Sequence, residues 1–239
     1  MNLRSIYVWS VIYDMIRSDL GFSLEDDIRA SLTATKLCNI EATLRTEAYI
    51  GKLIKDKKVL VVGAADSCTR CCEISKLYDV IIASDGALRC CLEVGVKPHI
   101  VVTDLDGIEP KDLLLSDVVF VVHAHGDNIY RLIQYLSYAK GAKNIIITTQ
   151  VPLLMNSCLR VYGGFTDGDR AAYLAYFFNA STIGFVGFDF EGLVGRYSKP
   201  WLKKPIHPSI TKLKKFIWAK RLLKLLEYVA GGEVSIEHY

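Results

Sequence analysis

Residues 100–107 read Ile-Val-Val-Thr-Asp-Leu-Asp-Gly, an apolar run that ends at two aspartates separated by one residue and followed by glycine. The β-branched residues at 100–102 predict a buried strand, and Asp104, Asp106 and Gly107 predict the turn that leaves it. Carboxylates at the end of a core strand need a cleft, a metal ion or water around them. Open α/β sheets bind their ligands at this end of the strands. The stretch therefore predicts a buried sheet with a site at its edge.

The same pattern repeats from residue 57 onward. Short apolar runs alternate with segments whose apolar residues recur near a 3.6-residue period. Continuous apolar strands joined by helices are typical of a mostly parallel sheet that is buried on both faces. The predicted fold class is α/β, with a mostly parallel Rossmann-like sheet and flanking helices. Strands are predicted at 59–62, 80–83, 100–102, 118–122, 145–147 and 182–186, and helices between them at 68–77, 87–94, 127–139 and 167–178.

The two ends of the chain differ from this pattern. Residues 1–55 predict a small helical subdomain, which precedes an α/β domain spanning residues 56–239. In the first part, Ser23 and Asp26 match a capping box. The apolar positions that follow at helical spacing are Leu24, Ile28, Leu32, Leu37, Ile40 and Leu44. The chain closes with a basic helix from Ser209, whose predicted buried residues are Leu213, Phe216, Ile217, Leu222, Leu223 and Leu226.

Composition limits the classes of function. The chain has 239 residues, of which 51% are hydrophobic and 23% charged, as expected for a folded domain. Its net charge of +3 is too small to argue for nucleic acid as a partner. No apolar run approaches the roughly 18 residues that span a membrane, and Asp14 interrupts the apolar N-terminal segment where a signal peptide would need continuity. We therefore expect a cytoplasmic protein with neither a nucleic acid nor a membrane as partner, and the hydrophobic N-terminal helix is a candidate homodimer interface.

The cysteines predict core packing. Their number is odd, and the chain is neither short nor evidently secreted, so no disulfide framework is expected. No second Cys-x-x-Cys pair or paired histidines lie at zinc spacing. Buried free cysteines usually behave as small apolar residues. The seven are Cys38, Cys68, Cys71, Cys72, Cys90, Cys91 and Cys158.

Polar turns follow five of the predicted strands. Because the carboxyl ends of parallel strands meet at one sheet edge, these turns are expected to converge on one crevice. Asp85 joins Asp104 and Asp106 there, and like charges held together usually surround a cation. Carboxylate oxygens suit Mg²⁺, which commonly takes one or two of them plus phosphate oxygens. The turns are Gly63-Ala64-Ala65-Asp66-Ser67, Ser84-Asp85-Gly86, Thr103 to Gly107, His123-Ala124-His125-Gly126-Asp127-Asn128, and Gly187-Phe188-Asp189.

Three further segments are candidates for binding. His123 and His125 are expected to point to the same side of their strand, which favours contact with a ligand for at least one of them. The alternative is a purely structural turn, in which Asp127 caps the helix that follows. Thr166 and Asp169 match a capping box. The glycines before Thr166 would allow backbone amides to approach a phosphate, and so would Gly63 in the turn after the first strand. In the basic C-terminal region, Arg196 and Lys199 follow a strand directly and are expected near the ligand, while the other basic residues form either a solvated face or a polyphosphate site.

Together these motifs resemble the archaeal 6-hydroxymethylpterin diphosphokinases, which are similar to thiamin pyrophosphokinase. The resemblance covers residues 59–190 and rests on Asp85-Gly86-Ala87, Thr103 to Gly107, His123 to Asn128, and Gly164-Phe165-Thr166-Asp167-Gly168-Asp169-Arg170. It implies transfer of diphosphate from ATP to 6-hydroxymethyl-7,8-dihydropterin with Mg²⁺, releasing AMP. Asp85, Asp104 and Asp106 would hold the metal. The catalytic residues would be Asp104, Asp106, Asp127 and Arg170, and the substrate-binding residues Gly63, Ser67, Asp85, Gly86, His123, His125, Asn128, Gly164, Thr166, Asp167, Asp169, Arg196 and Lys199.

Other functions fit the same carboxylates. Diphosphate transfer to thiamin uses the same donor. A metal-dependent glycosyltransferase also binds a metal-nucleotide through Asp-x-Asp, and a non-catalytic nucleotide-binding module needs no acceptor. Within the diphosphokinase hypothesis, the base that activates the acceptor hydroxyl is either Asp127 or a metal-bound water.

Overall fold

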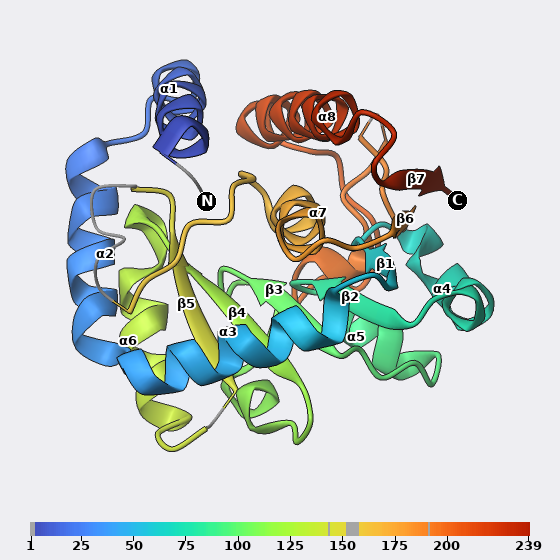
Figure 1. Cartoon of the computed structure of the whole chain (residues 1–239), viewed down its shortest axis with the longest axis horizontal. Coiled ribbons are helices and arrows are strands. Elements are labelled where there is room, and N and C mark those ends of the chain that lie inside the picture. Colours follow the sequence, from blue (N-terminus) through green and yellow to red (C-terminus); the bar gives the residue numbers. More distant parts are fainter. Residues whose placement is uncertain (1–2, 143, 152–157, 191) are drawn as a thin grey trace.

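The computed structural model describes residues 3–142, 144–151, 158–190 and 192–239. Its centre is a seven-stranded sheet (Figure 1). The strands are β1 (Lys58–Val62), β2 (Val80–Ser84), β3 (Ile100–Thr103), β4 (Val119–Ala124), β5 (Ile145–Thr149), β6 (Thr182–Val186) and β7 (Ser235–His238). Their order is β5-β4-β3-β2-β1-β6-β7, and every neighbouring pair is parallel. The predicted α/β fold class is confirmed.

Helices cover both faces of the sheet. The α-helices are α1 (Leu3–Leu20), α2 (Leu24–Leu37), α3 (Ile40–Ile54), α4 (Cys71–Ile74), α5 (Ala87–Glu93), α6 (Ile129–Tyr138), α7 (Asp167–Phe177) and α8 (Ile210–Ala230). Shorter 3₁₀ helices are η1 (Asp66–Arg70), η2 (Ser75–Leu77), η3 (Pro110–Leu114), η4 (Gly126–Asn128) and η6 (Arg196–Ser198). One core joins the sheet to α4, α5 and α6, and the other joins it to α3, α7 and α8.

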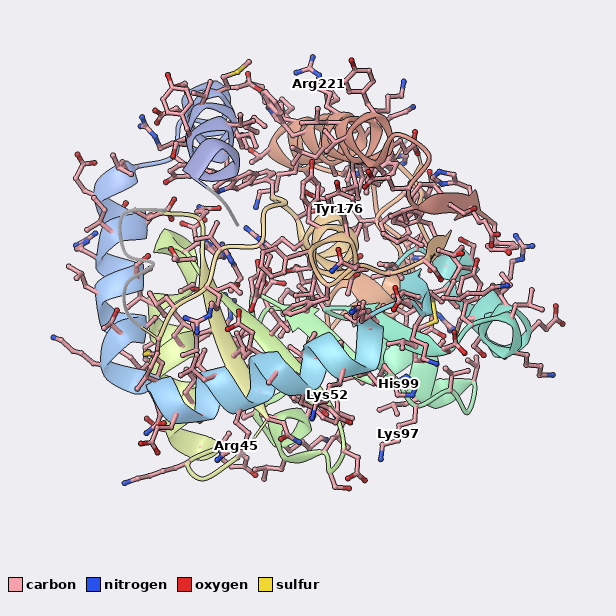
Figure 2. All side chains as sticks on the ribbon, in the orientation of Figure 1. Arg45, Lys52, Lys97, His99, Tyr176 and Arg221 are labelled. Atoms are coloured by element: carbon pink, nitrogen blue, oxygen red, sulfur yellow. A yellow bond between two sulfur atoms is a disulfide. The ribbon has the colours of Figure 1, made fainter. Side chains whose placement is uncertain are left out.

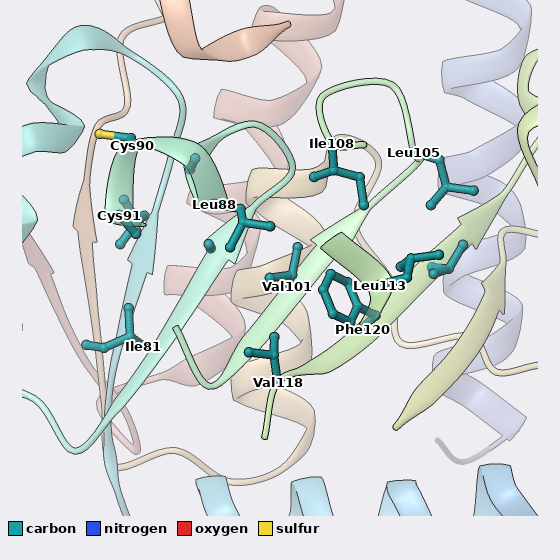
Figure 3. Packing of buried hydrophobic residues seen from close by; sticks show 14 of the residues in the cluster. Ile81, Leu88, Cys90, Cys91, Val101, Leu105, Ile108, Leu113, Val118 and Phe120 are labelled. Carbon is teal, nitrogen blue, oxygen red and sulfur yellow. The ribbon is translucent and has the colours of Figure 1, made fainter. Parts of the chain in front are cut away.

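Alternation along the strands supplies these two cores. In β1, Leu60 and Val62 face one core, while Val59 and Val61 face the other. Figure 3 shows the first core, where Val101 and Phe120 of the sheet pack with Leu88 of α5. These four residues of β1 are fully buried, which explains why this part of the sequence is a continuous apolar run.

The six predicted strands are confirmed to within two residues at each end. The strand β7 was not predicted, because its sequence Ser-Ile-Glu-His is short and half polar. The predicted helix at 68–77 forms as three short helical turns, η1, α4 and η2. The other predicted helices lie where the apolar period placed them.

The N-terminal helices are confirmed, but most of their regularly spaced apolar residues are not buried. Leu32, Leu37, Ile40 and Leu44 are exposed. Small and polar residues are buried instead, because their short side chains allow the helices to approach the rest of the protein closely. Farther along, two large residues of α3 enter the sheet core. The buried residues are Asp27, Ala30, Ser31, Ala34, Thr43, Thr46, Ile50 and Ile54. The division into domains at residue 55 stays a prediction.

The basic helix begins where predicted, with Ser209 as its cap. Leu222, Leu223 and Leu226 are buried as expected, but Leu213 and Ile217 are exposed. The reason is that α8 contacts α1 through other residues than those predicted. Trp218 and Leu222 of α8 pack with Trp9, Tyr13 and Ile16 of α1. Figure 1 shows α1 and α8 on the same side of the sheet, and in Figure 2 the exposed Arg221 projects outward from α8.

Two disulfides correct the prediction for the cysteines. Cys38 is bonded to Cys158, which lies 120 residues away in the sequence, and Cys68 is bonded to Cys90. The sequence gives no spacing signal for either pair, because the fold alone brings the partners together. Core packing is confirmed for Cys68, Cys90 and the free thiols that lie beside them; these are Cys71 and Cys91.

None of the described helices combines the length and the apolar character needed to cross a membrane.

Candidate active site

The turns after the strands enclose a cavity of about 660 Å³. It lies at the carboxyl edge of the sheet, so the predicted convergence of these turns is confirmed. Each of the strands β1 to β6 contributes lining residues in or just after its last residue. The lining residues that the sequence singled out are Gly63, Asp85, Asp104, Asp106, His125, Asp127, Thr166, Asp167, Arg170 and Lys199.

Asp85 is held at the centre of this edge by the neighbouring strand. Its Oδ1 accepts hydrogen bonds from Thr103 Oγ1 (2.7 Å) and from the backbone amide of Gly107 (3.0 Å). A Cβ at position 107 would lie 2.0 Å from Asp85 Oδ2, so this close approach requires glycine. The turn that follows β3 therefore fixes the carboxylate that ends β2.

Asp85, Asp104 and Asp167 form a group of three carboxylates. One oxygen of each lies within 4.8 Å of the others, which is close enough for all three to bind one ion. Asp167 Oδ1 is buried and has no hydrogen-bond partner among the described residues. Three carboxylates that offer hard oxygen donors this close together fit Mg²⁺ or a similar divalent cation.

The pKa values of the group reflect its crowding. Burial, followed by the charges of Asp167 and Asp104, raises the pKa of Asp85 well above its usual range. Burial and the charge of Asp104 raise the pKa of Asp167 to about 8. Burial also acts to raise the pKa of Asp104, but the hydrogen bond and charge of His125, together with Lys199, bring it well below its usual range. The site thus concentrates negative charge that a cation would neutralise.

Asp106 does not join this group in the structure. Leu105, between the two aspartates, adopts a positive φ of 72° and is fully buried. Asp104 contacts His125 Nε2 at 3.3 Å, whereas Asp106 pairs with Lys199. Asp167, from the start of α7, supplies the third carboxylate.

The backbone around Lys199 is held in place by Arg89. Arg89 of α5 donates hydrogen bonds to the carbonyls of Arg196, Lys199 and Pro200. Burial would lower the pKa of Lys199, but Asp85 and Asp106 raise it, so the ammonium stays charged. The side chain of Arg196 turns away from the cavity and lies over the Tyr197 ring, with its guanidinium carbon 4.6 Å from the centroid.

The histidine turn divides into a cavity side and a buried side. His125 lines the cavity, and its neighbour Asp127 is exposed at the rim. His123 is buried, with Nδ1 2.9 Å from Thr148 Oγ1, and burial lowers its pKa well below the usual value. Asn128 is also buried and ties the turn together: its Nδ2 donates to the carbonyls of Asp104 (2.8 Å) and His123 (2.7 Å). The structure thus places His123 and Asn128 behind the site.

The start of α7 has the predicted capping box. Asp169 is buried and accepts hydrogen bonds from the amides of Phe165 (2.5 Å) and Thr166 (2.8 Å), so it caps the helix. Gly164 has a positive φ of 80°, and a Cβ there would meet the backbone of Arg170. Arg170 itself reaches the cavity, where Nη1 lies 3.6 Å from Asp167 Oδ1.

The turn after β1 offers fewer amides to a phosphate than predicted. The amides of Gly63 and Ala65 donate to Val186 O (2.8 Å) and Gly187 O (3.0 Å) of the β6 end. Ser67 is exposed and does not line the cavity. Gly86 also lies outside the lining, packed so closely on the Tyr197 carbonyl that a Cβ would come within 1.8 Å.

Asp27, which the sequence did not single out, connects the N-terminal helices to the site. Its carboxylate accepts hydrogen bonds from Tyr13 Oη (2.6 Å), Gln150 Nε2 (2.6 Å) and the Gly126 amide (2.7 Å). Gln150 Oε1 in turn accepts from Arg170 Nη2 (3.3 Å). One buried carboxylate thus positions both the turn that carries His125 and the side chain next to Arg170. Sequence spacing could not reveal it, because its partners lie up to 123 residues away.

We expect Asp27→Ala to destabilise the protein by about 3 kcal/mol, because it leaves buried donors without an acceptor. It should also reduce turnover about tenfold or more, because the His125 turn and Gln150 lose their common anchor. Denaturant unfolding and steady-state kinetics would measure both effects. The matched control is Asp14→Ala, which removes an exposed carboxylate that pairs with Arg17 outside the cavity and should cost less than about 1 kcal/mol. Equal effects for the two variants would contradict the positioning role.

Comparison with known proteins gives a consistent result. A family model described as 6-hydroxymethylpterin diphosphokinase MptE-like matches residues 35–193. A curated protein from Pyrococcus furiosus is 36% identical over 229 residues, covering 92% of this chain and 93% of the relative. One from Methanothermobacter thermautotrophicus is 34% identical over 241 residues, covering 98% and 99%. One from Methanocaldococcus jannaschii is 32% identical over 231 residues, covering 92% and 94%. All three are named 6-hydroxymethyl-7,8-dihydropterin pyrophosphokinase.

Proposed function

The chain belongs to the 6-hydroxymethylpterin diphosphokinase MptE-like family, and from this membership we propose that it transfers diphosphate from ATP to 6-hydroxymethyl-7,8-dihydropterin. In this reaction the hydroxymethyl oxygen attacks the β-phosphorus of ATP. The bond between the β-phosphorus and the oxygen bridging to the α-phosphorus breaks, AMP leaves, and the hydroxyl proton passes to a base. The observation that carries the proposal is the group of Asp85, Asp104 and Asp167 in the cavity beside Arg170 and Lys199.

The three carboxylates would hold Mg²⁺. When bound, the ion neutralises charge on the polyphosphate. Two observations support this role: Asp167 Oδ1 accepts no hydrogen bond from a described residue, and the pKa values of Asp85 and Asp167 are raised. A bound cation would relieve both. His125 keeps Asp104 ionised through its hydrogen bond and charge.

The other side chains of the cavity would act by positioning and charge. Phosphoryl transfer needs little covalent chemistry from the protein, so fixed cations aimed at the phosphate oxygens provide most of the catalysis. Arg170 is buried against Asp167 and oriented by Gln150, which suits it to stabilise negative charge on the transferred group. Asp127, exposed at the rim, is our candidate for the base that receives the hydroxyl proton.

The test is a product assay. The purified protein is incubated with ATP, Mg²⁺ and 6-hydroxymethyl-7,8-dihydropterin, and nucleotides and pterins are separated by chromatography. We expect AMP and the pterin diphosphate in equal amounts. Formation of ADP, or turnover with thiamin in place of the pterin, would overturn the proposal.

A further inference from the structure

The start of α8 forms a wall of the cavity that the proposed mechanism does not use. Lys212 and Lys215 lie in its first two turns and line the same cavity as the three carboxylates. The helix begins beside them, with the Ser209 side chain capping the Lys212 amide at 3.2 Å. Two cationic side chains from one helix therefore face the space where a substrate would bind.

These lysines differ from Arg170 and Lys199 because they form no ion pair with an acidic side chain in the described part of the chain. Arg170 lies near Asp167, and Lys199 pairs with Asp106. Neither Lys212 nor Lys215 is within 4.0 Å of a carboxylate oxygen of any described residue. Their ammonium groups lie over aromatic rings instead. Lys212 Nζ is 5.2 Å from the Phe216 centroid, and Lys215 Nζ is 5.5 Å from that of Phe22.

The surroundings of Lys212 favour an anionic ligand. Burial lowers its pKa, and the nearby positive charges of Lys199 and Lys215 lower it further. Three lysines gathered at one cavity repel one another, and an anion between them would relieve this repulsion. The same cavity also holds the three carboxylates. A ligand that contacts both the lysines and the carboxylate group must carry negative charge for the lysines, and it must reach the carboxylates through a bound cation.

The chemistry of the substrates identifies the ligand. A reduced hydroxymethylpterin carries no phosphate, whereas the donor carries a chain of charged phosphates. We infer that Lys212 and Lys215 bind the β- and γ-phosphates of the donor nucleotide. This inference rests on the proposed function for the identity of the donor. The diphosphate product carries the same two phosphates and would share the site.

Binding measurements test the inference without turnover. Titration calorimetry with Mg²⁺ would compare α,β-methylene-ATP, whose scissile bridge is blocked, with inorganic pyrophosphate and AMP. Lys212→Met and Lys215→Met keep most of the apolar stem and remove the charge. Each should weaken binding of the ATP analogue and of pyrophosphate by roughly 10- to 100-fold, as expected for one charge-assisted hydrogen bond, and leave AMP binding unchanged.

The control is Lys224→Met, an exposed lysine of the same helix that does not line the cavity. It should leave all three affinities unchanged. Unaltered affinity for pyrophosphate in both cavity variants, or an equal loss for AMP, would overturn the inference. A wild-type protein that fails to bind the ATP analogue would instead overturn the proposed donor. Circular dichroism of each variant checks that α8 still folds.

Discussion

Replacing Asp104 with asparagine is expected to lower the rate of AMP formation by at least about a thousandfold. The substitution keeps the size of the side chain and removes the charge from the carboxylate that is most firmly ionised in the site. It removes one of three candidate metal ligands, and it leaves His125 with a weaker partner. Affinity for Mg²⁺ should fall by at least about 100-fold, since even residues that only support a ligand cost 10- to 100-fold.

Asp106→Asn is the matched comparison, because it makes the same change two residues away. In the structure Asp106 pairs with Lys199 and lies outside the carboxylate group. We expect this variant to keep its Mg²⁺ affinity within about threefold, while its turnover falls because Lys199 loses its tether. Calorimetric titration with Mg²⁺ separates the two cases. A large loss of metal affinity in Asp106→Asn would favour the ligand set predicted from the sequence, with Asp106, over the group of Asp85, Asp104 and Asp167.

This contrast shows where sequence reasoning stops. The strands were predictable because strands buried on both faces are short, nearly continuous apolar runs rich in β-branched residues, as in β1 and β3. The convergence of their turns then followed from parallel topology. The grouping of Asp167, and not Asp106, with Asp85 and Asp104 was not predictable. It depends on the left-handed backbone at Leu105, which directs the aspartates on either side of it to different partners.

The N-terminal helices show a second limit. Their exposed leucines form the more regular apolar pattern, so periodicity alone does not identify the buried face of α2 and α3. What places these helices is close packing of alanine, serine and threonine, together with the buried carboxylate of Asp27. Such contacts join residues far apart in the chain and leave no local pattern. The disulfide between Cys38 and Cys158 is invisible in the sequence for the same reason.

Asp167→Asn is expected to have opposite effects on activity and on stability. Activity should be lost, because the variant lacks a candidate metal ligand. The metal-free protein should become more stable at pH 8, because the substitution removes a half-buried charge from beside Asp104 and Asp85. Burial and the neighbouring charges destabilise the folded protein when Asp167 is ionised, whereas a neutral amide at this position avoids this cost. We expect a gain of about 2 kcal/mol, or roughly 4–8 °C in melting temperature.

The pH dependence provides the decisive measurement. The pKa of Asp167 is raised from 3.8 to about 8, so the folded protein binds a proton more tightly than the unfolded chain. The resulting stability is fully present below pH 4 and is lost as the pH rises toward 8. Denaturant unfolding in a chelator should therefore show equal stabilities for wild type and variant at pH 4, with the variant ahead at pH 8. Asp117→Asn, at an exposed carboxylate, should show no such divergence.

With saturating Mg²⁺ at pH 8 the order of the two stabilities should reverse, since only the wild type gains the free energy of metal binding. A variant that is less stable than the wild type in chelator at pH 8 would mean that Asp167 is held by contacts that outweigh its repulsion.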